Sequence, residues 1–150
     1  GVMSFMSVWA KYLEVDFFGG EPLMNFKVVK QIVEYARSRE AEYNKKFRFT
    51  ITTNGLLLDD DKIEFINKEM SNVVLSIDGR KEVNDYFRVL PNGQGCYDMI
   101  LPKYQKLVAQ LENKKIKLRI KSKCVFFIKI VLTEIGWDQV LLQGQHSFVT

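Results

Sequence analysis

Residues 13–22 read Leu-Glu-Val-Asp-Phe-Phe-Gly-Gly-Glu-Pro, in which a stretch with apolar residues at 13, 15, 17 and 18 stops at two glycines. Such a stretch predicts a β-strand, and the Gly-Gly pair predicts its end. The apolar residues that follow recur at the spacing of a helix: Val29, Ile32, Val33 and Ala36. Asn25 stands where a helix N-cap is expected. A strand followed directly by a helix predicts the first part of a β-α-β unit.

The same order recurs along the chain. Residues 47–52 predict a second strand that stops at Asn54-Gly55, and residues 73–78 predict a third that stops at Gly79. Between them, Asp59–Asp61 places acidic side chains at a helix N-terminus, where the helix dipole favours them. A later helix is expected to carry one apolar face: Ile100, Tyr104, Leu107, Val108 and Leu111. Alternating strands and helices predict an α/β domain with a parallel sheet and right-handed crossovers.

The composition is that of a globular domain. The chain has 150 residues, of which 47% are hydrophobic and 27% charged, and its formal net charge is +4. Its apolar runs fall short of the roughly 18 residues that a membrane-spanning helix needs. We therefore expect a single domain over residues 1–150, located in the cytoplasm and without a membrane partner.

Cysteine and histidine are scarce, which excludes several classes of site. Cys96 and Cys124 are too few for a disulfide framework or a four-cysteine metal site, and each is expected to be a small buried hydrophobe. His146 is the single histidine, which nearly excludes a Ser-His-Asp or Cys-His catalytic centre.

Positive charge is concentrated in residues 114–123, where basic side chains occupy every second position from Lys115 to Lys123. This alternation favours an edge strand with a solvated lysine face, since lysines discourage edge-to-edge pairing. A nucleic-acid patch is the alternative, but no aromatic residues are interleaved with the lysines. We therefore expect no nucleic-acid partner.

Polar residues and glycines follow all three predicted strands. Ligands of parallel α/β sheets bind at the carboxyl ends of the strands, so these residues are expected to form one ligand site. Arg88 adds a guanidinium suited to a carboxylate. Such a set would bind a small zwitterion with a polar tail. The candidate site residues are Gly19, Gly20, Glu21, Thr53, Asn54, Ser76, Asp78 and Arg88.

Three motifs carry a family resemblance. Phe-Phe-Gly-Gly-Glu-Pro at 17–22, Thr-Thr-Asn-Gly at 52–55 and Leu-Ser-Ile-Asp-Gly at 75–79 resemble, in order and spacing, the radical S-adenosylmethionine (SAM) enzymes. The branch most similar is the peptide- and protein-modifying one with SPASM or twitch extensions. Within it, residues 88–108 most resemble the maturases that form thioether cross-links in SCIFF peptides. The resemblance covers residues 13 to about 111, and residues 112–150 diverge.

The resemblance implies a partial (β/α)6 TIM-like barrel of parallel strands that binds SAM against a [4Fe-4S] cluster. SAM cleavage in this family yields a 5′-deoxyadenosyl radical, which abstracts hydrogen from a peptide or protein substrate. Carried over by position, Gly19, Gly20 and Glu21 would hold the amino group of SAM. Ser76 and Arg88 would engage its carboxylate and ribose region. The remaining candidates would line the pocket or order the loop: Thr53, Asn54 and Asp78.

Two features depart from the family pattern. The family's CxxxCxxC loop, which ligates the cluster, is absent, and neither cysteine replaces it by spacing. The auxiliary-cluster cysteines of the SPASM region are also missing, although residues 133–142 resemble a later part of the barrel. We therefore expect a core fragment without metal ligands or catalytic residues, inactive by itself. The alternative is a degenerate, non-catalytic domain that binds SAM, another nucleoside or a peptide.

A barrel without its first strand has an exposed edge. That edge would lie beside residues 13–18, leaving Phe17 and Phe18 uncovered. We therefore expect self-association through it, by strand pairing or domain swapping.

Overall fold

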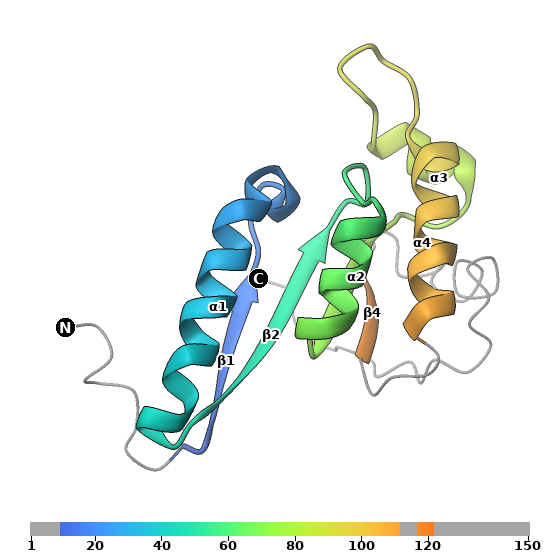
Figure 1. The fold of residues 1–150 in the computed structure, drawn as a ribbon. Helices are drawn as coiled ribbons and strands as arrows, with labels where there is room; N and C mark the ends of the chain where they lie inside the picture. The colour runs from blue at the N-terminus through green and yellow to red at the C-terminus, as the bar shows by residue number, and fades with distance from the viewer. Residues whose placement is uncertain (1–9, 112–116, 122–150) are drawn as a thin grey trace, which may run out of the picture.

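A computed structural model describes residues 10–111 and 117–121, and it has the predicted α/β architecture (Figure 1). Among the described residues, four parallel strands form one sheet in the order β1-β2-β3-β4. The strands are β1 (Tyr12–Phe17), β2 (Lys46–Thr53), β3 (Asn72–Ser76) and β4 (Lys117–Lys121). The helices are η2 (Pro22–Asn25), α1 (Phe26–Tyr43), α2 (Asp60–Glu69), α3 (Lys81–Phe87) and α4 (Tyr97–Leu111).

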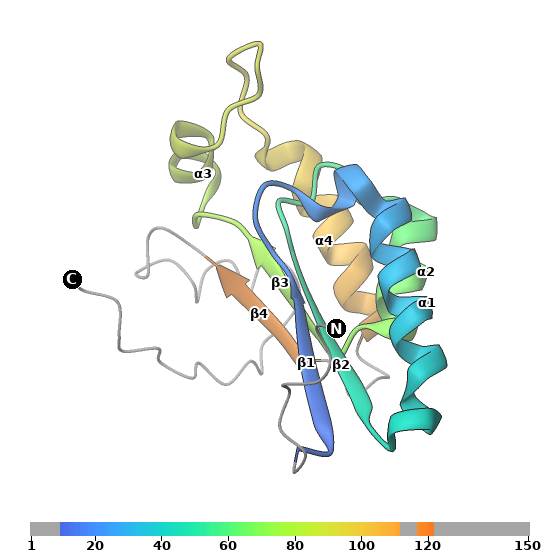
Figure 2. The ribbon, with the colours of Figure 1, turned by 90° about the vertical axis from the view of Figure 1, so that its left-hand side faces the viewer.

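The hydrophobic core lies on one face of the sheet, where α1, α2 and α4 pack (Figure 2). Alternate strand residues point to this face, because successive side chains of a strand point to opposite sides. The largest fully buried side chains of this core are Tyr104, Phe49, Ile51, Ile63, Ile66, Leu75, Ile77, Ile100, Leu107, Val33 and Val73. The faces predicted for α1 and α4 supply several of these side chains, but Ile32, predicted on the α1 face, is 42% exposed.

The beginning of α1 differs from expectation. Asn25 is the N-cap residue of α1, as predicted, but its side chain makes no capping hydrogen bond. A short 3-10 helix, η2, precedes α1, and Glu21 caps η2 by accepting a hydrogen bond from the backbone N–H of Leu23 at 3.1 Å. Helical structure therefore begins at Pro22, before the first residue of α1.

The acidic run before α2 has the predicted role. Asp59 is the N-cap of α2 and accepts a hydrogen bond from the backbone N–H of Lys62 at 2.9 Å. The Lys62 ammonium also pairs with this carboxylate. The side-chain bond from Lys62, and then its backbone bond, hold the pKa of Asp59 below its usual range.

We expect Asp59→Ala to lower the free energy of unfolding by about 1 kcal/mol, because the cap bond is lost. Since the pKa of Asp59 is lowered in the folded state, its contribution is complete at neutral pH and disappears as the pH falls through that lowered pKa. Urea unfolding at several pH values measures both effects. Asp61→Ala, in the same helical turn, is the matched control. An equal loss in the two variants would contradict the capping role.

The two edges of the described sheet are β1 and β4. Phe17 is buried and stacks on Phe49 with 6.0 Å between ring centroids, so the expectation that it lies uncovered was wrong. Phe18 points to the opposite face and is 66% exposed, as expected. The pairing of β4 with β3 confirms a strand within the basic stretch.

Other predictions concern single residues. Cys96 is buried, as predicted. Cys124, His146 and residues 133–142 lie outside the described residues.

Within residues 10–111 and 117–121, none of the helices combines the length and the apolar character needed to cross a membrane.

Candidate functional site

The carboxyl ends of β1, β2 and β3 lie at the same edge of the sheet. The segments there, residues 18–22, 53–56 and 76–80, are called the rim. Gly19 and Gly20 adopt φ values of +91° and +51°, which favour glycine. A Cβ added to either glycine would meet nothing within 4 Å, so the space over this turn is open. Their carbonyl oxygens accept no hydrogen bond from the described residues.

Glu21 joins the turn after β1 to the end of β2. Its Oε1 accepts hydrogen bonds from the Thr53 hydroxyl at 2.8 Å and from the backbone N–H of Leu23 at 3.1 Å. Its Oε2 accepts from the backbone N–H of Asn54 at 2.7 Å. Three candidate residues, Glu21, Thr53 and Asn54, are thus brought together in a first cluster. Because three protein donors already occupy the carboxylate, Glu21 serves chiefly to hold the Gly19-Gly20 turn against β2.

Thr53 and Asn54 also shape their own loop. The Thr53 hydroxyl accepts a hydrogen bond from the N–H of Gly55 at 3.0 Å, and Asn54 Oδ1 accepts from the N–H of Leu56 at 3.0 Å. The second bond is an Asx turn, a common use of Asn at a strand end. The side chains of both residues are therefore engaged within the rim.

A second cluster, made of Ser76, Asp78 and Arg88, follows β3. Asp78 is fully buried, and its Oδ2 accepts a hydrogen bond from Arg88 Nε at 2.7 Å. The backbone N–H of Asp78 donates to Asn84 Oδ1 at 3.2 Å, which fastens α3 to the loop. Arg88 uses only its Nε, so Nη1 and Nη2 make no hydrogen bond with the described residues. The hydroxyl of Ser76 likewise makes none with the described residues.

Tyr104 of α4 connects the two clusters. Its hydroxyl lies 3.1 Å from the carbonyl oxygen of Ser76 and 3.4 Å from that of Thr53. Burial raises the pKa of Tyr104 well above its ordinary value, while the nearby Arg88 charge lowers it and the Glu21 charge raises it. The sequence analysis predicts Tyr104 only as a core residue, because it shares an apolar helix face with Ile and Leu. The signal that could have indicated its contact with the rim is its hydroxyl, the one polar group on that otherwise aliphatic face.

Cys96 is a buried side chain that packs near the second cluster. Its sulfur lies 3.6 Å from Asn84 Nδ2, beside Asp85, whose carboxylate accepts a hydrogen bond from the N–H of Tyr97 at 2.8 Å. Asp85 thereby satisfies a backbone donor at the start of α4. Among the described residues, no group of three or more His, Cys, Asp or Glu side chains could hold a metal ion.

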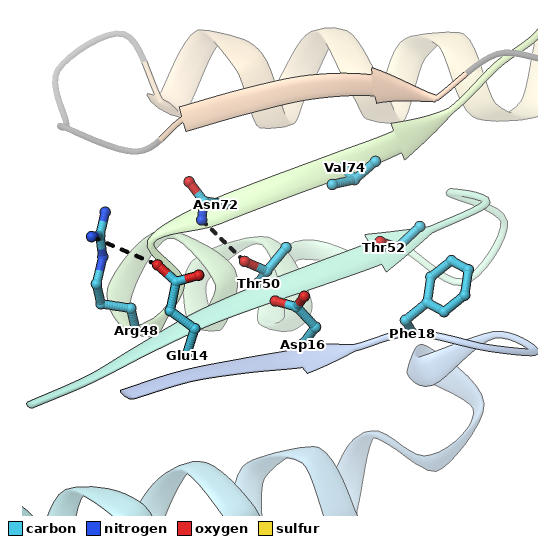
Figure 3. Close-up of a pocket in the computed structure, with 8 residues that line it drawn as sticks. All are labelled: Glu14, Asp16, Phe18, Arg48, Thr50, Thr52, Asn72 and Val74. Atoms are coloured by element: carbon cyan, nitrogen blue, oxygen red, sulfur yellow. Dashed lines mark hydrogen bonds and ion pairs between the residues drawn. The ribbon is translucent and has the colours of Figure 1, made fainter. Parts of the chain in front are cut away.

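A pocket of about 340 Å³ lies on the sheet face opposite the helices (Figure 3). The Arg48 guanidinium lies 3.8 Å from the Glu14 carboxylate there, and Asn72 Nδ2 donates to the Thr50 hydroxyl at 3.0 Å. Its other lining residues are Asp16, Phe18, Thr52 and Val74. Since Phe18 immediately precedes the Gly19-Gly20 turn, this polar face adjoins the rim.

Comparison with known proteins gives a consistent result. The family model of the radical SAM superfamily matches residues 6–122. The chain is 29% identical over 76 residues to the radical SAM cyclopropyl synthase TigE of Paramaledivibacter caminithermalis, covering 51% of this chain and 16% of that protein. It is 28% identical over 86 residues to a cysteine-type anaerobic sulfatase-maturating enzyme of Clostridium novyi, covering 57% of this chain and 23% of that protein.

A solved structure of native anSMEcpe, with bound AdoMet and the Kp18Cys peptide, has a similar fold. The TM-score is 0.66 at 22% sequence identity, and the match covers 83% of this chain and 35% of that one. The chain thus spans about a third or less of the length of these proteins, and the structural likeness concerns the fold.

Proposed function

Because this chain belongs to the radical SAM superfamily, we propose that its rim binds S-adenosylmethionine. The observation that carries the proposal is the Gly19-Gly20 turn, whose two carbonyl oxygens accept no hydrogen bond from the described residues and whose glycines would each have open space around an added Cβ. A SAM-bound structure with the same fold supports the choice of ligand.

The rim residues fit the methionyl part of SAM. An ammonium group donates hydrogen bonds, and the carbonyls of Gly19 and Gly20 are suitable acceptors. A carboxylate accepts them, and Arg88 offers its Nη groups while Ser76 offers its hydroxyl. Glu21, through its three hydrogen bonds, would keep the glycine carbonyls in place.

The reactive chemistry would come from SAM itself, and the protein's residues would bind and orient it. When bound and reductively cleaved, SAM supplies a 5′-deoxyadenosyl radical that abstracts hydrogen from a substrate. In our proposal the chain's own residues bind and orient the methionyl group. The Asp78–Arg88 pair fixes the position of the guanidinium, and the Glu21 bonds fix the glycine turn. The described residues do not fit a [4Fe-4S] cluster, so we assign them no part in holding one.

Gly19→Ala is expected to weaken SAM binding at least about tenfold, because the new methyl group would occupy open space at the turn that we assign to the ligand. Anaerobic calorimetry measures the affinity. Gly93→Ala is the matched control, since Gly93 also has positive φ, at +82°, and open space around its Cα. Both substitutions should cost about 1 kcal/mol of folding stability, because alanine is strained in this region.

Three outcomes are informative. SAM affinity lost in Gly19→Ala and kept in Gly93→Ala would support the rim site. Equal loss in both variants would show that the effect comes from backbone strain. A folded parent chain that binds no SAM at millimolar concentration would overturn the proposal.

We propose further that the substrate of the whole protein is a peptide or protein. The names of a sulfatase-maturating relative and of a peptide-bound structure with this fold support this class. The polar pocket beside the rim offers the hydroxyls of Thr50 and Thr52 and the carboxylate of Asp16 as hydrogen-bonding groups for such a substrate. The finer assignment, to SPASM-type maturases that form thioether cross-links, rests on the sequence motif at residues 88–108.

A further inference from the structure

We propose that Tyr104 is a positioning residue, whose hydroxyl holds the carboxyl ends of β2 and β3 at the spacing that the ligand site requires. This inference rests on the proposed binding of SAM at the rim. It adds a residue of α4 to a site otherwise built from the loops after the strands and from Arg88 at the end of α3.

The geometry supports the role directly. The register between β2 and β3 ends with the pair Thr53 and Leu75, so the Ser76 carbonyl lies just beyond the part of β3 that pairs with β2. The Tyr104 hydroxyl, 3.1 Å from the Ser76 oxygen and 3.4 Å from the Thr53 oxygen, bridges the two strand ends beyond that point. Ser76 carries the hydroxyl that we assign to the ligand, and Thr53 holds Glu21. One phenol group therefore contacts the backbone of both clusters.

The ring has no freedom to move away. Tyr104 is fully buried, and it packs against Gly55 so closely that a Cβ on Gly55 would lie 2.2 Å from Tyr104 Cε1. Packing of this density fixes the side chain in one rotamer. The position of the hydroxyl is therefore set by α4 and Gly55 and not by the strand ends it contacts.

The protonation state also suits the role. Burial, which is the main cause, keeps the pKa of Tyr104 well above its ordinary value, and the Arg88 charge opposes this only in part. The phenol therefore remains a hydrogen-bond donor throughout the physiological pH range. We expect its contribution to the site to be independent of pH there.

The test is a double-mutant cycle on SAM affinity with Tyr104→Phe and Ser76→Ala, measured by anaerobic calorimetry on the full chain. Tyr104→Phe keeps the ring and removes only the hydroxyl, and we expect about a tenfold weaker affinity. If Tyr104 acts through Ser76, adding Tyr104→Phe to Ser76→Ala should weaken binding by clearly less than tenfold. Leu107→Ala, at another buried position of α4, should reduce stability while leaving SAM affinity unchanged.

A measurement on the parent chain keeps the test independent of whether the variants fold. With tyrosines labelled at Cζ, SAM should shift the NMR resonance of Tyr104, which is buried beneath the rim. It should leave that of Tyr43 in place, because Tyr43 is the last residue of α1, at the end of that helix away from the rim. No shift of Tyr104 would overturn the inference. So would unchanged affinity in Tyr104→Phe, or losses that multiply fully in the cycle. A parent chain that binds no SAM would instead overturn the proposed function itself.

Discussion

Arg88→Ala is expected to lower the free energy of unfolding by about 3 kcal/mol. The substitution would remove the guanidinium that donates to Asp78 Oδ2 at 2.7 Å, so a fully buried carboxylate would lose this nearby opposite charge. A buried charge that loses its partner costs several kilocalories per mole, because the interior cannot replace the lost solvation. Urea unfolding followed by circular dichroism measures the loss.

Two further variants identify the cause. Arg39→Ala removes an arginine whose side chain is 40% exposed beside Glu42 on the surface of α1, and it should lower stability only slightly. The double variant Asp78→Asn with Arg88→Met removes both charges and should recover part of the loss. An Arg88→Ala protein as stable as Arg39→Ala would show that the pair does not support the fold. For this reason, loss of SAM binding in Arg88→Ala alone would not distinguish a ligand contact from unfolding.

Gly55→Ala is expected to be at least as damaging, at about 3 kcal/mol or more. Gly55 has a φ of +80°, which strains alanine, and its new Cβ would lie 2.2 Å from Cε1 of Tyr104. Tyr104 is fully buried, so its ring cannot give way without opening the core beneath the rim. Thermal and urea unfolding measure the effect.

Gly93→Ala again provides the comparison, because Gly93 has a φ of +82° and nothing within 4 Å of an added Cβ. It should show the backbone cost of about 1 kcal/mol alone. The difference between the two variants measures the overlap with Tyr104. Equal losses would show that the contact between Gly55 and Tyr104 is not tight in solution.

Much of the architecture could be predicted from local pattern. The strands at β1, β2 and β3, the helices α1, α2 and α4 and the parallel sheet all follow from apolar periodicity and from the glycines that end the strands. The prediction missed α3 and η2, which are short and carry too few turns to show a period. It also misplaced Phe17, because alternation shows that two faces exist and leaves open which face the helices will cover.

The sequence by itself determined that polar residues gather at one rim, since the carboxyl ends of parallel strands must lie together. It also determined the family, through three motifs whose spacing follows the β-α repeat. The tertiary structure alone decided what each rim side chain does. Glu21 holds a turn, Asp78 holds Arg88, and Tyr104 reaches the strand ends from a helix distant in sequence. These roles depend on which donors and acceptors meet in space, and hydrogen bonds act over about 3 Å. No local pattern specifies distances on that scale between residues that are 10 to 33 positions apart, as these are.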